Sequence, residues 1–399
     1  MKVGIIGQGY VGLNLSINAS ETGHEVWGYD QNEKLIADLA KAKSHIEGIA
    51  DSRLDAVLNN GTYTPISDPQ FLENVDVVII AVPTPLDEER KPDLGAIKSA
   101  VEVICHNVKS PVLIINESTS YPGTLRNEIA KKISERTGIE HLYASSPERV
   151  DPGNKEYDLR NTARLISGLT NAATEKAQEF YSVFCNEIIL VDTPEIAETA
   201  KLFENTFRQV NIALVNELAQ ISNALDIPVR KVIAAAATKP FGFMEFQPSA
   251  GVGGHCIPVD PSYLSFVAEI AGVTSKLIDG ANQINLNMSD YIVNRIKKDF
   301  GGELRGIAVN VIGVAYKPNV SDTRETPARR LIELLTKEGA EVKWHDPIVK
   351  RWNNQTSSPI SKDEALIVVT LHDVMDIGEI LKAHYLFDCT GKIPGALGI

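Results

Sequence analysis

Short β-branched segments alternate with helical segments over the first 190 residues, and this alternation constrains the fold more than any other feature of the sequence. It predicts a parallel sheet whose strands are joined by crossover helices. The predicted strands are Lys2–Ile6, Glu25–Tyr29, Val75–Ala81, Val112–Asn116 and Ile188–Val191. The predicted helices are Val11–Thr22, Glu33–Lys41, Leu94–Asn107 and Thr124–Thr137.

The pattern changes near Pro194. From Glu195 to Leu225 apolar residues recur at helical spacing without a Pro or Gly, which predicts one unusually long helix. This helix is either a core element or a spine that joins two domains and buries one face against a second subunit. Two further helices are predicted at Pro228–Ala237 and Lys276–Phe300.

Strand and helix alternation returns after Gly301-Gly302. Three strands and one helix are predicted there: Ala308–Tyr316, Glu341–His345 and Ala365–Leu371 as strands, and Pro327–Gly339 as a helix. The predicted fold class is therefore α/β, with a helical middle and a second, smaller α/β domain. We expect the domains to be residues 1–193, 194–300 and 301–399.

The charge of the chain is unevenly distributed. The 399 residues carry a formal net charge of −13, and residues 1–200, with 18 basic and 30 acidic side chains, account for −12 of it. This balance argues against a nucleic-acid partner. No apolar run is long enough for a membrane span, and the apolar part of the N-terminal segment is too short for a signal peptide. We expect no membrane partner and a cytoplasmic location.

Four cysteines lie far apart and form no C-x-x-C pair. A disulfide framework or a bound metal is therefore not expected, and the spacing is typical of a reducing compartment. Cys105, Cys185 and Cys389 lie in helical or strand patterns, and we interpret them as core residues.

A glycine-rich turn follows the first predicted strand: Gly7-Gln8-Gly9-Tyr10-Val11-Gly12. In this context Gly7 allows the tight turn, Gly9 lets the backbone approach a pyrophosphate, and Gly12 lets the helix pack on the strand. The pyrophosphate would lie at the helix N-terminus, beside Tyr10 and Val11.

An acidic residue supports the interpretation of this turn as a dinucleotide-binding site. Asp30 lies 18 residues after Gly12, at the end of the second predicted strand. A carboxylate there binds the ribose hydroxyls and disfavours a 2′-phosphate, so NAD is the predicted cofactor. The alternative is a glycine turn with a surface aspartate.

Two more loops follow predicted strands and carry small polar groups. Pro83 and Thr84 follow the third strand, and Ser118 and Thr119 follow the fourth. Ligands of open α/β sheets bind at the carboxyl ends of strands, so we expect these residues at the cofactor. Because Pro and Ser are also common in turns, simple turn chemistry is the alternative.

A second glycine-rich segment surrounds the fourth cysteine. Gly251, Gly253 and Gly254 precede Cys256, and Asp260 follows four residues later. A loop cysteine beside backbone N–H groups, with a lysine or a helix N-terminus near, is favoured as a thiolate nucleophile. The alternative is a glycine turn with an inert, buried cysteine.

Seven motifs occur in order over essentially the whole chain: GQGYVG, VPTP, EST, SPERVDPG, AETAKLFENTFRQVNIALVNEL, GVGGHCIPVDP and KPNVSDTRET. In this order they resemble the UDP-glucose/GDP-mannose dehydrogenase family. The resemblance implies an N-terminal Rossmann-type NAD domain, a central helix through which two subunits form a homodimer, and a C-terminal Rossmann-like domain that binds a UDP-sugar. It also implies a four-electron oxidation of the sugar C6 alcohol to a carboxylate, using two NAD⁺.

The resemblance assigns catalytic residues one by one. Cys256 matches the nucleophile that forms a thiohemiacetal and then a thioester. Lys201 and Asn205, four residues apart and so on one helix face, match the pair that stabilises the alkoxide and the oxyanion. Asp260 matches the carboxylate that positions the hydrolytic water.

It also assigns residues that contact the two ligands. Thr119 and Glu148 match loop residues beside the reacting sugar carbon. Lys317 matches a contact to the UDP-sugar, and Arg324 a contact near the cofactor phosphates. The remaining residues that we expect at the substrate are Arg149, Phe246, Gly251, Gly253 and Gly254.

The sugar is less closely defined. The loop GGHC-IPVD is similar to that of members acting on UDP-N-acetylhexosamines, whereas members acting on UDP-glucose usually carry Ser or Tyr before the Cys. Pro248-Ser249-Ala250-Gly251 departs from the Pro-Gly-Pro-Gly common in this branch, and Glu245 and Gln247 lie in the same loop, where Pro and Tyr are common. UDP-glucose 6-dehydrogenase is therefore the alternative.

Two other classes of protein compete with this prediction. A dehydrogenase of the β-hydroxyacid type transfers one hydride, and it needs neither Cys256 nor the C-terminal domain. A non-catalytic nucleotide-sugar binding protein would not need the predicted catalytic residues at all. The joint presence of Thr119, Lys201, Asn205, Cys256 and Asp260 argues against it.

Overall fold

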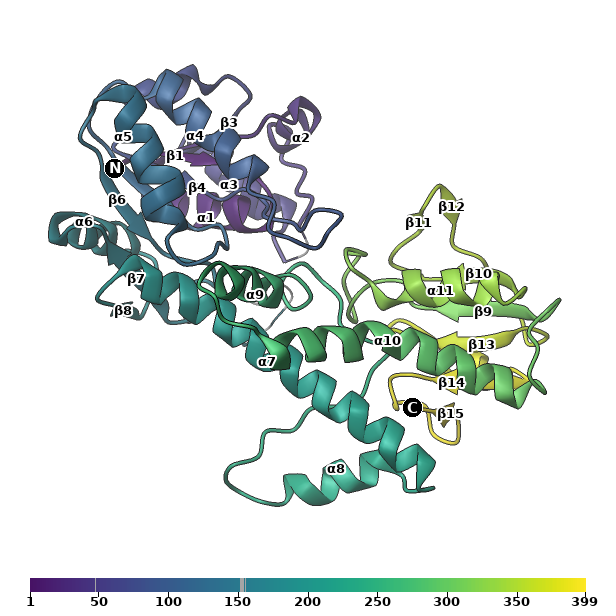
Figure 1. Cartoon of the computed structure of the whole chain (residues 1–399). Helices are drawn as coiled ribbons and strands as arrows, with labels where there is room; N and C mark the ends of the chain where they lie inside the picture. The colour runs from purple at the N-terminus through teal and green to yellow at the C-terminus, as the bar shows by residue number, and fades with distance from the viewer. Residues whose placement is uncertain (47, 151–153, 155) are drawn as a thin grey trace. The chain divides into compact units, whose positions relative to one another are not determined.

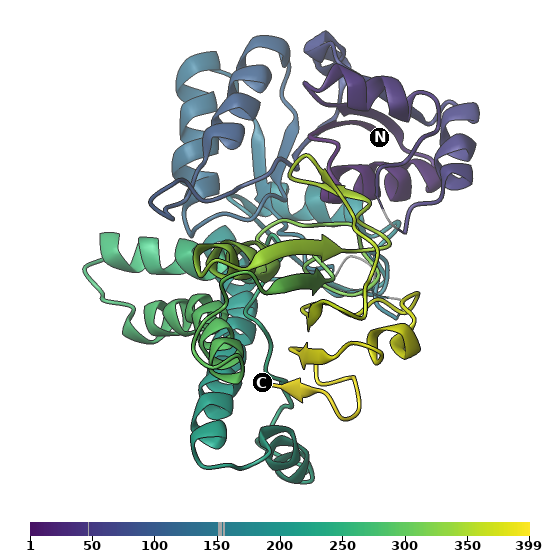
Figure 2. The same ribbon diagram turned by 90° about the vertical axis from the view of Figure 1, so that its right-hand side faces the viewer.

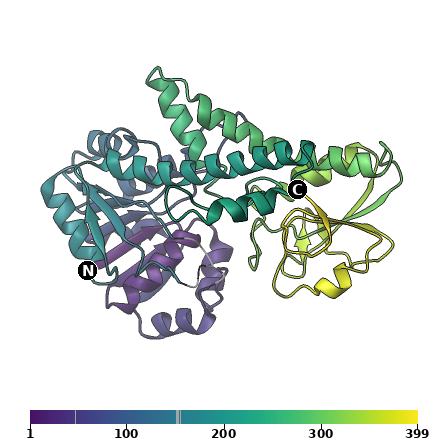
Figure 3. The same cartoon turned by 90° about the horizontal axis from the view of Figure 1, so that it is seen from below.

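The computed structural model describes residues 1–46, 48–150, 154 and 156–399, which form two compact units (Figure 1). Unit 1 consists of Met1–Glu204 and Phe266–Ala271, and unit 2 consists of Asn205–Ser265 and Gly272–Ile399. Helix α7 (Pro194–Ala224) contributes residues to both units and is one unbroken helix (Figure 3).

The core of unit 1 is an eight-stranded sheet in the order β3-β2-β1-β4-β5-β6-β7-β8. Strands β1 to β6 are parallel, whereas β7 runs antiparallel to β6 and parallel to β8. The first six strands have the order 3-2-1-4-5-6 of dinucleotide-binding folds. The strands are β1 (Lys2–Ile6), β2 (Glu25–Tyr29), β3 (Tyr63–Ile66), β4 (Val77–Ile80), β5 (Leu113–Asn116), β6 (Leu142–Ser145), β7 (Arg164–Gly168) and β8 (Ile188–Leu190).

The five strands predicted for this region are confirmed, although three of them are shorter than predicted. Strands β3, β6 and β7 lie outside the predictions. β3 contains Pro65, which interrupts a strand pattern but is tolerated in an edge strand. β6 and β7 mix apolar residues with serine and arginine, so their β-branched content is low.

Helices connect these strands: α1 (Tyr10–Glu21), α2 (Glu33–Leu39), α3 (Asp51–Asn59), the 3₁₀ segment η1 (Pro69–Asn74), α4 (Gly95–Asn107), the π-helical segment η2 (Thr124–Ala130), α5 (Lys131–Thr137) and α6 (Asn171–Tyr181). The predicted helix over residues 124–137 is therefore confirmed as helical, but its first half has π geometry. Gly123, with φ 92°, is the N-cap residue directly before that segment.

The core of unit 2 is a five-stranded parallel sheet in the order β10-β9-β13-β14-β15, whose strands lie side by side in Figure 2, coloured green to yellow. Its strands are β9 (Ala308–Ile312), β10 (Glu341–His345), β13 (Ala365–Val368), β14 (Tyr385–Asp388) and β15 (Leu397–Gly398). The hairpin of β11 (Arg351–Trp352) and β12 (Gln355–Thr356) is inserted after β10. This 2-1-3-4-5 order is the second common nucleotide-binding topology.

The helices that follow α7 are α8 (Val229–Ala237), α9 (Asp260–Ile270), α10 (Lys276–Asp299), α11 (Pro327–Lys337) and α12 (Ile377–Ile380). Those predicted at residues 228–237, 276–300 and 327–339 are confirmed. The strand predicted as Ala308–Tyr316 ends at Ile312, because Gly313 has φ 80° and a Cβ there would lie 1.9 Å from the carbonyl oxygen of Thr370. The strand predicted to end at Leu371 ends at Val368.

The four cysteines form no disulfide. Cys185 and Cys389 belong to the buried cores of units 1 and 2, as predicted. Cys105 is half-buried on α4, so the prediction of a core residue is wrong for this position.

Helix α7 is confirmed as a long helix. Part of it is buried, including Ala213, Val215 and Ala219. Other apolar side chains on it are exposed within the chain, among them Phe203 at 62% and Leu214 at 60%.

Candidate functional site

The glycine turn of unit 1 gives its three glycines three different roles. Gly7 has φ 94°, and a Cβ there would lie 2.5 Å from the carbonyl oxygen of Ala81. A Cβ on Gly12 would lie 1.8 Å from the carbonyl oxygen of Gly7. A Cβ on Gly9 would meet no atom within 4 Å. The turn and the close packing therefore need Gly7 and Gly12, while the open backbone at Gly9 fits a pyrophosphate.

Asp30 lies beside this turn. It follows β2, and its Oδ2 accepts a hydrogen bond from the backbone N–H of Gln8 at 2.9 Å. Tyr10 and Val11 form the first turn of α1, with Gly9 at its N-cap. The carboxylate predicted to bind the ribose and the helix N-terminus thus lie together at the carboxyl ends of β1 and β2, and their contact with NAD stays a prediction.

A buried network that the sequence analysis missed supports the turn. Gln8 donates to the carbonyl oxygens of Ile5 and Gly7 and accepts from the Tyr63 hydroxyl at 2.8 Å. Its side chain is fully buried. A glutamine between two motif glycines was the available signal, but its partner Tyr63 lies on β3, which was not predicted.

The loops after β4 and β5 are tied together. The Ser118 hydroxyl accepts a hydrogen bond from the Val82 backbone N–H at 2.9 Å and donates one to the Val82 carbonyl oxygen at 2.8 Å. Thr84 is buried and Pro83 is exposed, while Thr119 is half-buried. β1 and β4 are neighbours at the point where the strand order reverses, so these loops lie at the ligand-binding edge of the sheet. Their cofactor contacts stay predictions.

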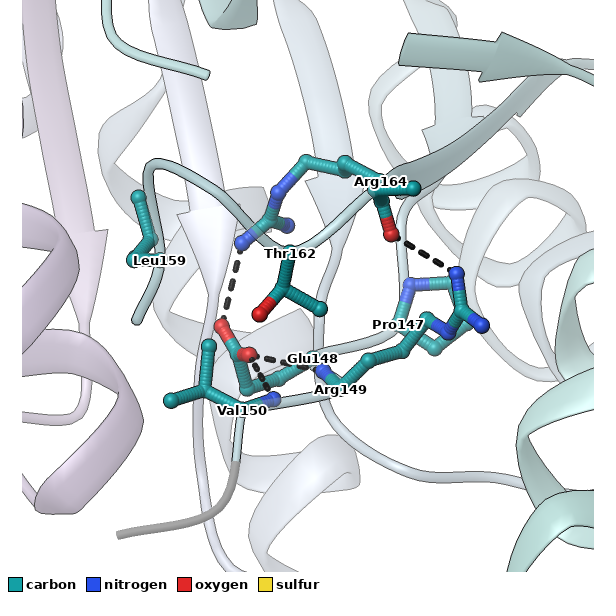
Figure 4. Close-up of a pocket in the computed structure, with 8 residues that line it drawn as sticks. Pro147, Glu148, Arg149, Val150, Leu159, Thr162 and Arg164 are labelled. Carbon is teal, nitrogen blue, oxygen red and sulfur yellow. Dashed lines mark hydrogen bonds and ion pairs between the residues drawn. The ribbon is translucent and has the colours of Figure 1, made fainter. Parts of the chain in front are cut away.

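Glu148 is one of eight residues that line a small pocket in unit 1. The eight are residues 147–150, Leu159 and residues 162–164 (Figure 4). Its Oε1 accepts from the backbone N–H groups of Arg149 and Val150 at 2.7 and 2.6 Å. Its Oε2 accepts from Arg164 at 3.0 Å. The carboxylate is thus fixed at both oxygens. The later part of the SPERVDPG motif, residues 151–153, lies outside the described residues.

Arg149 joins this loop to α7. Its guanidinium pairs with Glu204 at 2.7 Å and donates to the carbonyl oxygen of Ala163 at 2.7 Å. Lys201 lies three residues before Glu204 on α7 and is 7% exposed. The guanidinium that was predicted to bind substrate is therefore engaged by a carboxylate of the same unit.

Glu198 is a buried carboxyl on α7 that the sequence analysis did not predict as a functional residue. Its two carboxylate oxygens accept from the backbone N–H groups of Gly123 and Leu125 at 2.7 and 3.0 Å. These contacts hold the loop that carries Thr119 against the helix that carries Lys201. Burial raises the pKa of the Glu198 carboxyl to about 8, although the two N–H groups favour its charged form.

The stability of the protein should therefore change with pH through Glu198. A carboxyl whose pKa is higher in the folded state stabilises the fold at low pH, and this stability is lost as the pH rises from 4.5, the ordinary pKa, to about 8, the pKa in the folded state. The thermal unfolding temperature should fall as the pH rises across this window, and Glu198→Gln should show a smaller fall. Arg126 lowers the pKa of the neighbouring Glu195, so Glu195→Gln should keep the wild-type slope. Equal slopes for wild type and Glu198→Gln would contradict this prediction.

In unit 2, the segment around Cys256 ends in the first turn of α9. The carbonyl oxygen of Cys256 accepts from the backbone N–H groups of Val259 and Asp260 at 3.1 and 2.8 Å. Asn205 donates to Asp260 Oδ2 at 2.6 Å, and both side chains are buried. Cys256 itself is half-buried. Two predicted catalytic residues from distant parts of the sequence are thus brought together next to the cysteine turn.

The glycines before Cys256 approach protein groups closely. A Cβ on Gly253 would lie 2.9 Å from the Cβ of Tyr316, and one on Gly254 would lie 2.8 Å from the Tyr316 ring. Gly251, with φ 135°, would bring a Cβ within 2.9 Å of the carbonyl oxygen of Asn285. The backbone N–H of Gly254 donates to the carbonyl oxygen of Arg324 at 3.0 Å. Their predicted substrate contacts are not tested by this packing.

The remaining predicted residues, Lys317, Arg324 and Phe246, also lie in unit 2. Lys317 follows β9, at the point where the order of this sheet reverses between β9 and β13. Its ammonium lies 5.7 Å from the centre of the Tyr316 ring. Arg324 is exposed and pairs with Asp322 at 2.6 Å. Phe246 packs edge-on against Phe207 and the small apolar cluster of α7 and α8.

Among the residues that the structure describes, no cluster of three or more His, Cys, Asp or Glu side chains could hold a metal ion. In the same residues, none of the helices combines the length and the apolar character that crossing a membrane requires.

Comparison with known proteins extends this picture. Models of the UDP-glucose/GDP-mannose dehydrogenase family match three segments of the chain: the NAD binding domain at residues 1–185, the central domain at 195–287 and the UDP binding domain at 310–393.

Relatives with known names are similar over nearly their whole length. A UDP-N-acetyl-D-mannosamine dehydrogenase of Methanococcus aeolicus is 35% identical, covering 97% of this chain and 90% of the relative. A UDP-N-acetyl-D-glucosamine 6-dehydrogenase of Pseudomonas aeruginosa is 34% identical, covering 88% and 83%. The solved UDP-D-ManNAc dehydrogenase of Pyrococcus horikoshii superposes with a TM-score of 0.90 at 29% identity, covering 100% and 98%.

The two nucleotide-binding sheets, the glycine turn and these matches define an NAD-dependent nucleotide-sugar dehydrogenase. The chain belongs to the UDP-glucose/GDP-mannose dehydrogenase family. The predicted family, fold class and cofactor are confirmed.

Proposed function

We propose that the protein oxidises the C6 alcohol of a UDP-N-acetylhexosamine to the uronic acid in two steps, each of which consumes one NAD⁺. The observation that carries the proposal is the buried pair of Asn205 and Asp260 at the turn that follows Cys256. An alcohol dehydrogenase that stops at the aldehyde needs no nucleophile there. A second oxidation needs one, because an aldehyde carbon must first become tetrahedral.

The first oxidation converts the alcohol to an aldehyde. NAD⁺ supplies the hydride acceptor when it is bound. The C6 hydroxyl loses its proton to a base, and Lys201 stabilises the alkoxide. Glu148 and Thr119 lie on the loops after β6 and β5, and we assign them to the surroundings of the reacting carbon.

The second oxidation proceeds through Cys256. Its thiolate adds to the aldehyde carbon and forms a thiohemiacetal, which loses a hydride and a proton to become a thioester. Asn205 stabilises the oxyanion, and Asp260 positions the water that attacks the thioester. Hydrolysis releases the carboxylate and regenerates the thiol.

The sugar is proposed from the named relatives and from the cysteine loop. UDP-N-acetyl-D-mannosamine and UDP-N-acetyl-D-glucosamine dehydrogenases are among the similar proteins. UDP-glucose is the second candidate, because Glu245, Gln247 and Ser249-Ala250 depart from the residues common in the N-acetylhexosamine branch.

A panel of UDP-sugars followed by NADH absorbance tests the substrate. The gluco, manno and galacto forms of UDP-N-acetylhexosamine should be compared with UDP-glucose. The proposal expects the highest kcat/KM for one of the N-acetylated sugars. A higher kcat/KM for UDP-glucose would contradict it, and no NADH with any of them would overturn the proposed reaction.

Three wider expectations belong to the same proposal. The domains are taken as residues 1–193, 194–300 and 301–399, and each family-model match falls within one of them. The exposed apolar side chains of α7, including Phe203 and Leu214, support a homodimer formed through that helix. The widely spaced cysteines, which form no disulfide, favour a cytoplasmic location.

A further inference from the structure

A buried group of charged side chains lies behind Glu148 in unit 1. Arg164 is 4% exposed, and one of its terminal nitrogens donates to Glu148 at 3.0 Å. The other pairs with Glu117 at 3.0 Å and donates to the carbonyl oxygen of Ser146 at 3.2 Å. Glu117 is fully buried and accepts a hydrogen bond from the Tyr181 hydroxyl.

The sheet topology creates this contact. β7 is antiparallel to β6, with Ser145 opposite Ser167. Continued past the end of β6, this register places Arg164 opposite Glu148. Glu117 directly follows β5, and its carbonyl oxygen accepts from the backbone N–H of Glu148 at 3.3 Å. Three neighbouring strands therefore converge on the Glu148 loop.

We propose that Arg164 and Glu117 are positioning residues for Glu148: Arg164 fixes one oxygen of the Glu148 carboxylate, and Glu117, held by Tyr181, fixes Arg164. The inference rests on the proposed function, in which Glu148 lies beside the reacting carbon. Figure 4 shows the result, with one Glu148 oxygen turned to Arg164 and the other to the backbone of Arg149 and Val150. Both oxygens of the carboxylate are therefore hydrogen-bonded.

The buried group contains more carboxyl groups than guanidinium groups. One guanidinium serves two carboxylates, and the other titratable side chains near Glu117 are Tyr181 and Cys185. Burial raises the pKa of Glu117 to about 7, although Arg164 lowers it. Glu117 Oε2 is buried without a hydrogen-bond partner, which fits a carboxyl that carries a proton near neutral pH.

This charge balance gives a pH signature. Below about pH 7 Glu117 is neutral, so the charge of Arg164 acts on Glu148 alone. Above that pH Glu117 is ionised, and its negative charge strengthens the contact that fixes the Arg164 guanidinium beside Glu148. The kcat of the wild-type enzyme should therefore show an inflection between pH 6 and 8 that Glu117→Gln lacks.

A double-mutant cycle tests whether Glu117 acts through Glu148. Glu117→Gln should lower kcat about 10-fold to 100-fold with KM changed less than about twofold, since the misplaced carboxylate affects the transition state more than binding. In a Glu148→Gln background the same substitution should have almost no further effect. Glu187→Gln is the matched control. The side chain of Glu187 is exposed, and it is the backbone carbonyl oxygen of this residue that contacts Arg164, by accepting from the Arg164 backbone N–H, so this variant should behave as wild type.

The outcomes separate the two proposals. Equal losses of kcat in both backgrounds, or a wild-type pH inflection in Glu117→Gln, would overturn the positioning role while the proposed function stands. A wild-type enzyme that forms no NADH with any UDP-sugar would overturn the proposed function. If Glu117→Gln melts below the assay temperature, Tyr181→Phe removes only the hydroxyl that holds Glu117. It should lower kcat in the same Glu148-dependent way, and unchanged kcat would contradict the role.

Discussion

Replacing Cys256 with serine should reduce formation of the uronic acid by at least about 10³-fold. A serine hydroxyl at this position is a far weaker nucleophile than a thiolate, so the aldehyde would not become a tetrahedral adduct. The alcohol oxidation does not need the thiol. The variant should therefore stop after one NADH per sugar, and mass spectrometry of the products should show aldehyde in place of carboxylate.

Cys105 provides the matched control for this variant. It is also a half-buried free thiol, but it lies on α4 of unit 1. Cys105→Ser should form acid at the wild-type rate. Acid formation by Cys256→Ser at the wild-type rate would show that the thioester route is wrong.

The second large effect is expected at the glycine turn, where Gly12→Ala and Gly9→Ala should fail in different ways. A Cβ on Gly12 would lie 1.8 Å from the carbonyl oxygen of Gly7, so Gly12→Ala should destabilise unit 1 by about 1–3 kcal/mol or more. Gly9→Ala has open space and should melt like wild type. Its methyl group would occupy the approach of the pyrophosphate, so the Kd for NAD⁺ should rise at least about tenfold.

Calorimetric NAD⁺ binding and thermal unfolding separate the two variants. Gly61→Ala is a useful reference, because Gly61 also has open space around its Cβ but has φ 69° and lies far from the turn in sequence. It should lose some stability without losing NAD⁺ affinity. Wild-type NAD⁺ affinity in Gly9→Ala would contradict the assigned pyrophosphate position.

Local patterns were enough to predict much of the fold. The strands β1 and β2 follow from β-branched runs, and α7 follows from helical spacing without a breaker. The glycine turn could be interpreted because its three positions serve three local purposes. The cysteine loop could be recognised from its motif, but its packing against Tyr316 could not, since Tyr316 lies 60 residues after Cys256.

The parts that the sequence could not predict depend on register between distant segments. β6 and β7 are short and carry serine or arginine, so neither has a clear strand pattern. Without them, nothing links Arg164 with Glu148 or Glu117. The same holds for Glu198, whose partners are backbone N–H groups at the start of a π-helical segment. No side-chain pattern encodes such a contact.

The number of NADH formed per UDP-sugar tests the central claim most directly. The purified enzyme, given excess NAD⁺ and a limiting amount of its best UDP-N-acetylhexosamine, should form two NADH per sugar and convert the sugar to a carboxylate. One NADH per sugar, with the aldehyde as the final product, would contradict a four-electron oxidation through Cys256.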